Sequence, residues 1–293
     1  MRKLGGVLRI RPFEPIRDRR EVERLWRASF PALWPVLPQG LDMLNGGRLA
    51  EHEARAIGLA ARSGPALQLL MACPGWRRKG IGSELFNAAQ KEAQSEGFDR
   101  LSLGSGGEDY IWPGIPSDAV DAIAFFELLG YRWGYIATDL VLDLPQWKPN
   151  AITIVTAQQA RVAVAPARSG AELAEVIAFE QRRFPRWVRY FERGEGILVA
   201  RRGTSVLGTL LYSTSACIYE PALASPCGSI GCVGVDPDAE SQGIATAMVL
   251  AATRIVRADG AACCHIGWTW RTGLYEQVEY RPWRTYLMST VNA

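Results

Sequence analysis

The sequence is poor in the residues that build metal centres and disulfide frameworks. It contains only two histidines, His52 and His265, among 293 residues, so a His-rich metal site is not expected. Its six cysteines show no C-x-x-C spacing, and several stand in apolar runs where a thiol acts as a small hydrophobe. These absences favour a reducing compartment, and we expect a cytoplasmic protein without a metal site.

Long hydrophobic runs and a strong net charge are also missing. No apolar run approaches the roughly 18 residues that cross a bilayer. Residues 1–15 also lack the long apolar stretch and the small-residue cleavage site of a secretory signal. The formal net charge of +3 is too small to argue for nucleic acid. We therefore expect neither a membrane nor a nucleic acid as a partner.

What the sequence does contain is one turn pattern that occurs twice. Each copy follows an apolar strand-like run ended by a proline and opens an amphipathic helix pattern that stops at a glycine, Gly97 or Gly260. Such a turn lets backbone N–H groups approach an anion at the positive end of a helix dipole. The first copy is Arg77, Arg78, Lys79, Gly80, Ile81, Gly82 and Ser83; the second is Glu240, Ser241, Gln242, Gly243, Ile244, Ala245 and Thr246.

Two further landmarks recur in the same order. A Phe-Pro-rich stretch ending in Trp stands at 30–34 and again at 184–187, and residues 274–281 repeat the pattern of residues 125–132. The polar, proline-flanked segment 145–150 interrupts the periodicity between the copies. The order indicates a tandem duplication, with domains at 1–146 and 151–293.

The turn does not match the common nucleotide-binding motifs. Gly75 and Gly80 have the spacing of G-x-x-x-x-G-K-[ST], but Ile81 stands where the lysine belongs, and Leu85 replaces the last glycine of G-x-G-x-x-G. What remains is R-x-x-G-x-G, or its variant ending in alanine. At this motif the chain resembles the GNAT superfamily of acetyl-coenzyme A-dependent N-acyltransferases, in which the turn binds the coenzyme A pyrophosphate.

This resemblance extends over nearly the whole chain and implies an α/β (α+β) fold. It implies two consecutive GNAT folds, each a mixed, mostly antiparallel sheet with splayed central strands flanked by helices. The splayed strands would be 67–73 with 98–103, and 229–235 with 261–267. The resemblance also implies that acetyl-coenzyme A binds between them, with Val233 and Val235 along its pantetheine chain.

The resemblance assigns a proton donor to the second half only. Tyr275 matches the family tyrosine that protonates the leaving thiolate, although an aromatic here can also be a packed core residue. The first half has Phe126 at this position, which cannot donate a proton. The second half departs from the family at Glu240, where Arg or Gln is usual, and at Glu279, where glycine is usual. We therefore predict that residues 151–293 catalyse and that residues 1–146 bind coenzyme A weakly or shape the acceptor cleft.

The sequence leaves the proton acceptor open. His265 lies in a predicted strand, where a histidine is more often a satisfied core residue. Other candidates for the base are the glutamates that precede or flank a predicted hairpin at 196–213, namely Glu192, Glu195 and Glu220. A chain of water molecules would accept the proton equally well.

The acceptor is predicted to be a small-molecule primary amine. Segments 30–34, 184–187 and 108–116 carry aromatic residues that suit stacking on a sugar, and Glu108 and Asp109 would attract an ammonium; the same aromatics would also fill a seam between halves. The loop 110–116 and residues 264–269 resemble GNAT pairs attached to β-N-acetylglucosaminidases, which implies an amino sugar. A mycothiol synthase-like acetyltransferase and a non-catalytic coenzyme A-binding module remain alternatives. A nucleotide hydrolase is a distant third, and we expect a monomer or homodimer.

Overall fold

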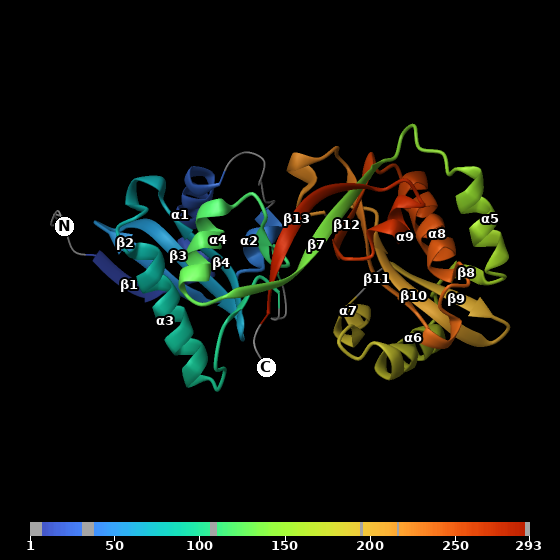
Figure 1. Cartoon of the computed structure of the whole chain (residues 1–293), viewed down its shortest axis with the longest axis horizontal. Helices are drawn as coiled ribbons and strands as arrows, with labels where there is room; N and C mark the ends of the chain where they lie inside the picture. The colour runs from blue at the N-terminus through green and yellow to red at the C-terminus, as the bar shows by residue number, and fades with distance from the viewer. Residues whose placement is uncertain (1–7, 31–37, 106–109, 194–195, 216, 291–293) are drawn as a thin grey trace. The chain divides into compact units, whose positions relative to one another are not determined.

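The computed structural model describes residues 8–30, 38–105, 110–193, 196–215 and 217–290 (Figure 1). Strands and helices follow each other in two similar series. The strands are β1 (Leu8–Pro12), β2 (Gly47–His52), β3 (Arg55–Ser63), β4 (Ala66–Ala72), β5 (Ser102–Leu103), β6 (Ile115–Pro116), β7 (Arg132–Asp143), β8 (Ala163–Pro166), β9 (Gly196–Arg202), β10 (Ser205–Ser213), β11 (Cys227–Val235), β12 (Cys263–Thr269) and β13 (Arg281–Thr290). The helices are α1 (Pro15–Ser29), α2 (Pro38–Asp42), α3 (Ile81–Ser95), α4 (Val120–Leu128), α5 (Ala151–Gln159), α6 (Gly170–Arg183), α7 (Val188–Arg193), α8 (Ile244–Ala258) and α9 (Thr272–Glu276), with 3-10 turns η1 (Pro74–Trp76), η2 (Glu220–Ala222) and η3 (Pro237–Ala239).

The first series forms a sheet in the order β1-β2-β3-β4-β5. Its neighbouring strands are antiparallel except for β4 and β5, which are parallel. Helix α3 packs on this sheet because Ile81, Leu85 and Ala89 share one buried face at helical spacing. Gly58 of β3 permits the close approach, since a Cβ there would lie 2.8 Å from Leu85 Cδ1.

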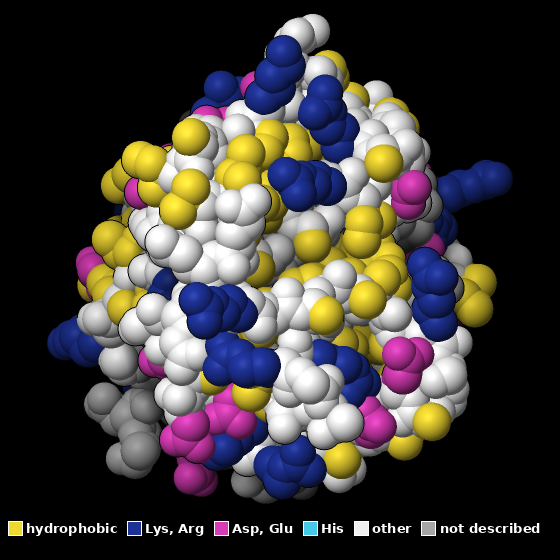
Figure 2. All heavy atoms as spheres, turned by 90° about the vertical axis from the view of Figure 1, so that its right-hand side faces the viewer, with side chains coloured by type: hydrophobic (Ala, Val, Ile, Leu, Met, Phe, Trp, Pro, Cys, Tyr) yellow, Lys and Arg dark blue, Asp and Glu magenta, His cyan; other side chains and the backbone are white. Residues whose placement is uncertain are grey.

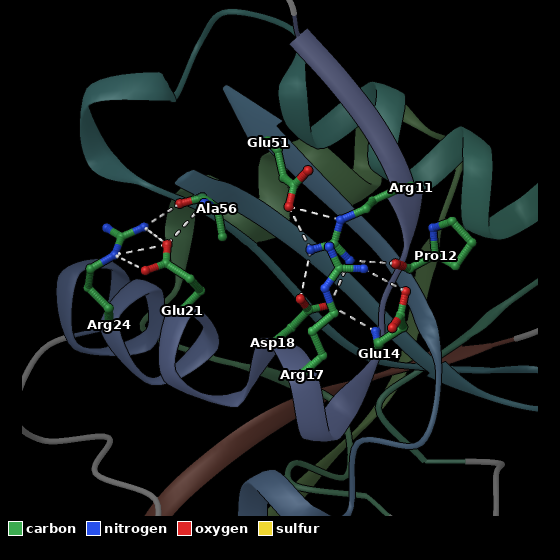
Figure 3. A network of polar contacts seen from close by, with 9 residues as sticks. All are labelled: Arg11, Pro12, Glu14, Arg17, Asp18, Glu21, Arg24, Glu51 and Ala56. Carbon is green, nitrogen blue, oxygen red and sulfur yellow. Dashed lines mark hydrogen bonds and ion pairs between the residues drawn. The ribbon is translucent and has the colours of Figure 1, made fainter. Parts of the chain in front are cut away.

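A buried polar network ties β1, α1 and β2 together (Figure 3). Arg11 donates to both carboxylate oxygens of Asp18 at 2.7 Å and also to Glu51. The side chains of Arg11 and Asp18 are only 8% and 5% exposed. Burial raises the pKa of Asp18, but the hydrogen bonds from Arg11 outweigh it and hold that pKa below its usual value. Mutual pairing is what allows both charges to lie inside the protein.

The second series contributes most of an eight-stranded sheet with the order β6-β13-β7-β12-β11-β10-β9-β8. Strands β11 and β12 are parallel, and the neighbouring pairs β12–β7, β11–β10, β10–β9 and β9–β8 are antiparallel. Side chains alternate between the two faces, as strand geometry requires. Leu198 and Ala200 of β9 pack in the core formed with α8 and α9, whereas Ile197 and Val199 pack with α6 and α7.

The chain divides into two compact units, residues Met1–Ala137 with Thr285–Ala293, and residues Thr138–Arg284. We call them unit 1 and unit 2. Strand β7 therefore begins in unit 1 and ends in unit 2, and β13 does the reverse. In unit 1, Thr290 Oγ1 donates to the Arg132 carbonyl, and in unit 2 Arg281 pairs with Asp143. Each unit is thus completed by a strand segment from the other half of the sequence; the limits 1–146 and 151–293 of the duplicated halves stay a prediction.

Two further features concern the described residues as a whole. None of the helices in the described part of the chain combines the length and the apolar character that a membrane crossing needs. Across the same ranges, no group of three His, Cys, Asp or Glu side chains is arranged to hold a metal ion.

Candidate active site

Both repeated turns adopt one backbone conformation. Arg78 and Gly80 have φ values of 60° and 88°, and Ser241 and Gly243 have values of 63° and 77°. A 3-10 turn precedes each pair, and the glycine is the N-cap of α3 or α8. The first N–H groups of a helix have no carbonyl partner within that helix, so each turn presents donors at the positive end of a dipole. This is the backbone that a phosphate group needs.

The first turn is open and basic. Arg77, Arg78, Lys79 and Gly80 are exposed, and a Cβ at Gly80 would meet no atom within 4 Å. Arg77 and Lys79 hold their positions by donating to backbone carbonyls. Of the remaining predicted residues of this turn, Ile81 is buried, Gly82 is half-buried and Ser83 is exposed.

The second turn is packed against helix α5. A Cβ at Gly243 would lie 2.7 Å from the carbonyl oxygen of Thr156, so only glycine allows this contact. Gln242 accepts a hydrogen bond of 2.9 Å from Arg202, and Glu240 lies 3.7 Å from Arg271. Of the remaining predicted residues, Ile244 and Thr246 are buried and Ala245 is half-buried. The backbone is therefore that of the first turn, while the surroundings are more crowded and the turn itself carries Glu240 in place of the arginine.

Figure 2 shows the face of the molecule on which α5 lies. Apolar side chains gather there between Lys and Arg side chains. On α5 itself, Ile152 is 77% exposed and Val155 is 49% exposed, so this helix turns its polar Thr153 inward and apolar groups outward. Thr153 is 1% exposed and donates to the carbonyl of Gln277, just after α9.

The central strands of unit 2 part as predicted by the resemblance. Parallel pairing of β11 with β12 runs from Cys227 and Cys263 to Ile230 and Ile266. Strand β11 then continues to Val235, paired only with β10. The half-buried Val233 and Val235 lie in this unpaired part. Unit 1 repeats the arrangement, because β4 continues to Ala72 after its last pairing with β5.

A β-bulge marks the place where β11 leaves its partner. Cys232 and Val233 both stand opposite Leu210 of β10, and Cys232 has a φ of 48°. A bulge adds one residue to the strand and redirects its backbone groups. The bulge lies at the point where the strands open.

Tyr275 lies at this opening. It is the buried residue of α9, 7% exposed, and its side chain interacts with Thr269 at the end of β12, while Cys232 in the bulge is near enough to act on it electrostatically. Burial raises the pKa of Tyr275 to about 12, so the phenol retains its proton at neutral pH. The predicted proton donor thus interacts with the end of β12 and, electrostatically, with the bulge of β11.

Phe126 takes the corresponding place in unit 1 and is a packed aromatic. Its ring makes edge contacts with Phe86, Phe125 and Tyr131 at centroid distances of 6.1, 5.2 and 5.6 Å. The residue five positions later is a buried, hydrogen-bonded tyrosine in both halves: Tyr131 donates to the Leu101 carbonyl and Tyr280 bonds Thr253. The two halves thus share this tyrosine and differ at the proton-donating position.

His265 is buried beside Asp139 on the face of the sheet that packs against α6. Its Nε2 lies 3.2 Å from Asp139 Oδ2, an ion pair without hydrogen-bond alignment. Burial lowers the pKa of His265, but Asp139 and the thiol of Cys217 outweigh it and raise that pKa to about 10. An imidazole that is already protonated at neutral pH cannot accept a proton, which argues against His265 as the base.

Among the other carboxylates predicted as candidate bases, the structure describes Glu220 and Glu192. Glu220 accepts hydrogen bonds from Ser225 and from the N–H of Cys227, which lower its pKa and give it a structural role. Glu192 is exposed on α7. Glu195, Glu108, Asp109 and residues 31–34 lie outside the described residues.

Sequence reasoning missed Glu180. This glutamate is 0% exposed on α6, with its carboxylate bonded to Thr209 of β10. The sequence contains a signal for it, because Val176, Phe179 and Glu180 share one helix face at spacings of three and four residues. A carboxylate on an otherwise apolar helix face is unusual and indicates a buried charge.

The aromatic segments predicted at the acceptor cleft pack within their own units. In unit 2, Phe184 and Trp187 stack at 4.9 Å, and a Cβ at Gly234 of β11 would lie 2.6 Å from Phe184. In unit 1, Trp112 stacks on Trp26 at 5.4 Å. The first of these clusters lies on the unpaired end of β11 and is therefore close to the opening.

Known proteins share this fold over the whole chain. A GCN5-related glucosamine N-acetyltransferase region of a fungal multi-domain GH3 β-N-acetylglucosaminidase matches with a TM-score of 0.87 and 23% identity, covering 98% of this chain and 38% of that one. This chain thus spans less than two fifths of that protein. A GCN5-related N-acetyltransferase from Sphaerobacter thermophilus matches with a TM-score of 0.72 and 17% identity, covering 96% and 94% of the two chains.

A tandem GNAT protein of the clavulanic acid biosynthesis pathway matches with a TM-score of 0.65 and 15% identity, covering 97% of this chain and 98% of that one. No curated protein sequence matches significantly. These likenesses confirm the predicted fold, two consecutive GNAT folds. The model of the acetyltransferase (GNAT) family matches twice, at residues 20–131 and 164–276. The chain therefore belongs to the acetyltransferase (GNAT) family, as a tandem member.

Proposed function

We propose that this chain is an acetyl-coenzyme A-dependent N-acetyltransferase of a small-molecule primary amine, and that unit 2 carries out the transfer. The observation that supports this most is the place of the Tyr275 side chain, between the bulge of β11 and the end of β12. A phenol that stays protonated at neutral pH is a suitable donor to a leaving thiolate.

The residues present fit the coenzyme. The turn Gln242–Thr246 would hold the pyrophosphate with backbone N–H groups, and Val233 and Val235 would lie along the pantetheine chain in the gap between β11 and β12. Bound there, acetyl-coenzyme A supplies an activated acyl thioester. Backbone N–H groups at the bulge would polarise the carbonyl oxygen, and Tyr275 would protonate the sulfur as the carbon–sulfur bond breaks.

The turn Arg77–Ser83 of unit 1 would hold a second coenzyme molecule without turnover. Its three cations and open surroundings suit a pyrophosphate, but Phe126 offers no proton. For the acceptor, we propose an amino sugar. The support is the likeness, at 23% identity, to the glucosamine N-acetyltransferase region of the fungal neighbour, together with aromatic surfaces of the kind that stack on sugar rings.

The test is release of free thiol from acetyl-coenzyme A in the presence of glucosamine and a panel of other primary amines. Activity with an amine supports the proposal. Ala245→Asp places a carboxylate in the second turn and should abolish turnover. The matched Gly82→Asp in the first turn should leave turnover unchanged and remove only one binding event for acetyl-coenzyme A in calorimetry.

A coenzyme A-binding module without activity is the second candidate. The contact between Gly243 and the Thr156 carbonyl favours it, because α5 occupies space beside the turn on which catalysis would depend. Binding of acetyl-coenzyme A in calorimetry without thiol release from any amine would establish the module and overturn the enzyme.

A further inference from the structure

Glu180 is a buried carboxylate that the structure leaves half satisfied. It lies on α6, 0% exposed. Its Oε1 accepts a hydrogen bond from Thr209 Oγ1, whereas its Oε2 has no hydrogen-bond partner among the residues that the structure describes. Leaving a buried carboxylate oxygen without a donor costs stability, so a purely structural glutamate would be expected to have one.

The neighbours of Glu180 place it beside the opening between the strands. Thr209 pairs with Gly234, the residue that follows the bulge of β11. Cys232 in that bulge interacts electrostatically with Glu180 and also with Tyr275. The carboxylate and the phenol thus both interact electrostatically with Cys232. They come from α6 on one face of the sheet and from α9 in the core of the other.

The charged groups around Glu180 leave it free to exchange a proton. Burial raises its pKa to about 7, with Thr209 lowering it. On its own helix, Arg183 is paired with Asp236 and Asp238. From α7, Arg189 acts on Cys232, and the Cys232 thiol itself has a pKa raised by burial to about 12 and stays neutral. Within the described ranges, no cation forms an ion pair with Glu180.

We propose that Glu180 is the catalytic base that takes the proton from the acceptor amine in unit 2. This inference rests on the proposed function. The amine nitrogen forms a bond to the thioester carbonyl carbon, and the carbon–sulfur bond breaks. One proton passes from nitrogen to the free Oε2 of Glu180, directly or through one water, and one passes from the Tyr275 hydroxyl to sulfur. Solvent returns the proton from Glu180 to Tyr275, so the products are an amide and a thiol.

The assignment explains why the carboxylate is both buried and near neutrality. A general base acts best when its pKa is close to the working pH, because it is then largely deprotonated and still basic. Burial on the apolar face of α6 provides this, and the Thr209 hydroxyl orients the carboxylate by holding Oε1. Thr209 is a positioning residue in this scheme.

The experiment measures kcat against pH at saturating acetyl-coenzyme A, with two acceptors whose ammonium pKa values differ by more than about one unit. For the wild type we expect a rate that rises with pH through about 7, with the same midpoint for both acceptors. Glu180→Gln should lower kcat by about 10²- to 10⁴-fold and remove this rise. Affinity for acetyl-coenzyme A in calorimetry and the melting temperature should not change.

Two further variants distinguish a loss of catalysis from a loss of structure. Thr209→Val removes the donor that lowers the pKa of Glu180, so the midpoint should move to higher pH. Glu175→Gln changes a glutamate on the same helix whose side chain is 56% exposed and should leave the profile unaltered.

The outcomes separate the two proposals. A wild type that releases thiol while Glu180→Gln keeps its rate and its pH profile overturns the role of Glu180 alone. If Glu180→Gln does not fold, an unmoved midpoint in Thr209→Val overturns it instead. A wild type that releases no thiol with any amine overturns the proposed function itself.

Discussion

The two repeated turns share a backbone and differ in everything around it. Positive φ values fall at the same two places in each, and the same 3-10 turn leads in. The first turn is open and surrounded by Arg77, Arg78 and Lys79, whereas the second meets the carbonyl of Thr156. The proton-donating position differs in the opposite sense. Unit 1, with the open turn, has Phe126, whereas unit 2, with the crowded turn, has Tyr275. Local sequence thus sets the shape of a turn, but neighbouring elements decide what the turn can bind.

The largest expected effect concerns the proton donor, and it tests whether the two units differ in catalysis. Tyr275→Phe should reduce kcat by about 10²- to 10⁴-fold, since the thiolate then leaves without an acid. The matched change Phe126→Leu in unit 1 should leave kcat within about twofold of the wild type. Steady-state thiol release measures both. If Tyr275→Phe left turnover untouched while Gly80→Glu abolished it, catalysis would belong to unit 1.

The buried charges of unit 1 provide the next largest effect. Asp18→Ala leaves the buried Arg11 with the Glu51 carboxylate and the Pro12 carbonyl as acceptors and should cost about 3 to 5 kcal/mol of stability. The exposed pair of Arg17 and Glu14, 63% and 55% exposed, is the control, and Glu14→Ala should cost less than about 1 kcal/mol. Urea denaturation measures the free energies. Equal losses in the two variants would show that burial does not distinguish the pairs.

The glycines of the two turns should respond unequally to alanine. Gly80→Ala meets open space and carries only the penalty of positive φ, about 1 kcal/mol. Gly243→Ala adds a methyl group 2.7 Å from the Thr156 carbonyl oxygen and should cost about 2 to 3 kcal/mol. The difference between the two denaturation midpoints is the measurement. Equal costs would mean that α5 moves away from the turn without resistance.

The two units should respond to pH in opposite directions. Asp18 has a lowered pKa in the folded protein, so its contribution is present above the unfolded value and is lost as the pH falls. His265 has a raised pKa of about 10, so its contribution is full below 6.5 and is lost between 6.5 and 10. The slope for one such proton approaches about 1.4 kcal/mol per pH unit. His265→Gln should flatten the alkaline limb of stability measured by urea unfolding, and an unchanged limb would assign it to other groups.

The smallest effect concerns the residue four positions after the proton-donating one. Glu279 has a φ of 74°, and Gly130 at the matching place in unit 1 has a φ of 82°. Glu279→Gly should therefore stabilise by up to about 1 kcal/mol, because it removes a left-handed non-glycine residue. Gly130→Ala should destabilise by about the same amount. Thermal unfolding of both variants tests the pair, and a loss of stability in Glu279→Gly would show that its 3.4 Å contact with Asn150 matters more than the backbone.

Much of the fold was predictable, because it depends on local patterns. The helix of residues 81–96 and the hairpin at 196–213 follow from apolar spacing and a turn between strands, and they appear as α3, β9 and β10. The hairpin β2–β3 and helix α5 were not predicted. Helix α5 escapes periodicity because it exposes Ile152 and Val155 and buries Thr153, so its apolar residues do not mark its inner face.

The sequence by itself determined the duplication, the GNAT fold, the two turns and the chemical difference between Phe126 and Tyr275. Each of these follows from short stretches of residues that are neighbours along the chain. Tertiary structure alone decided that β7 and β13 each complete the other half's unit, that Thr156 crowds Gly243, and that Glu180 meets Thr209 beside the bulge. These contacts join residues tens to hundreds of positions apart. Burial and electrostatics act on such neighbours in space, and no local pattern specifies them.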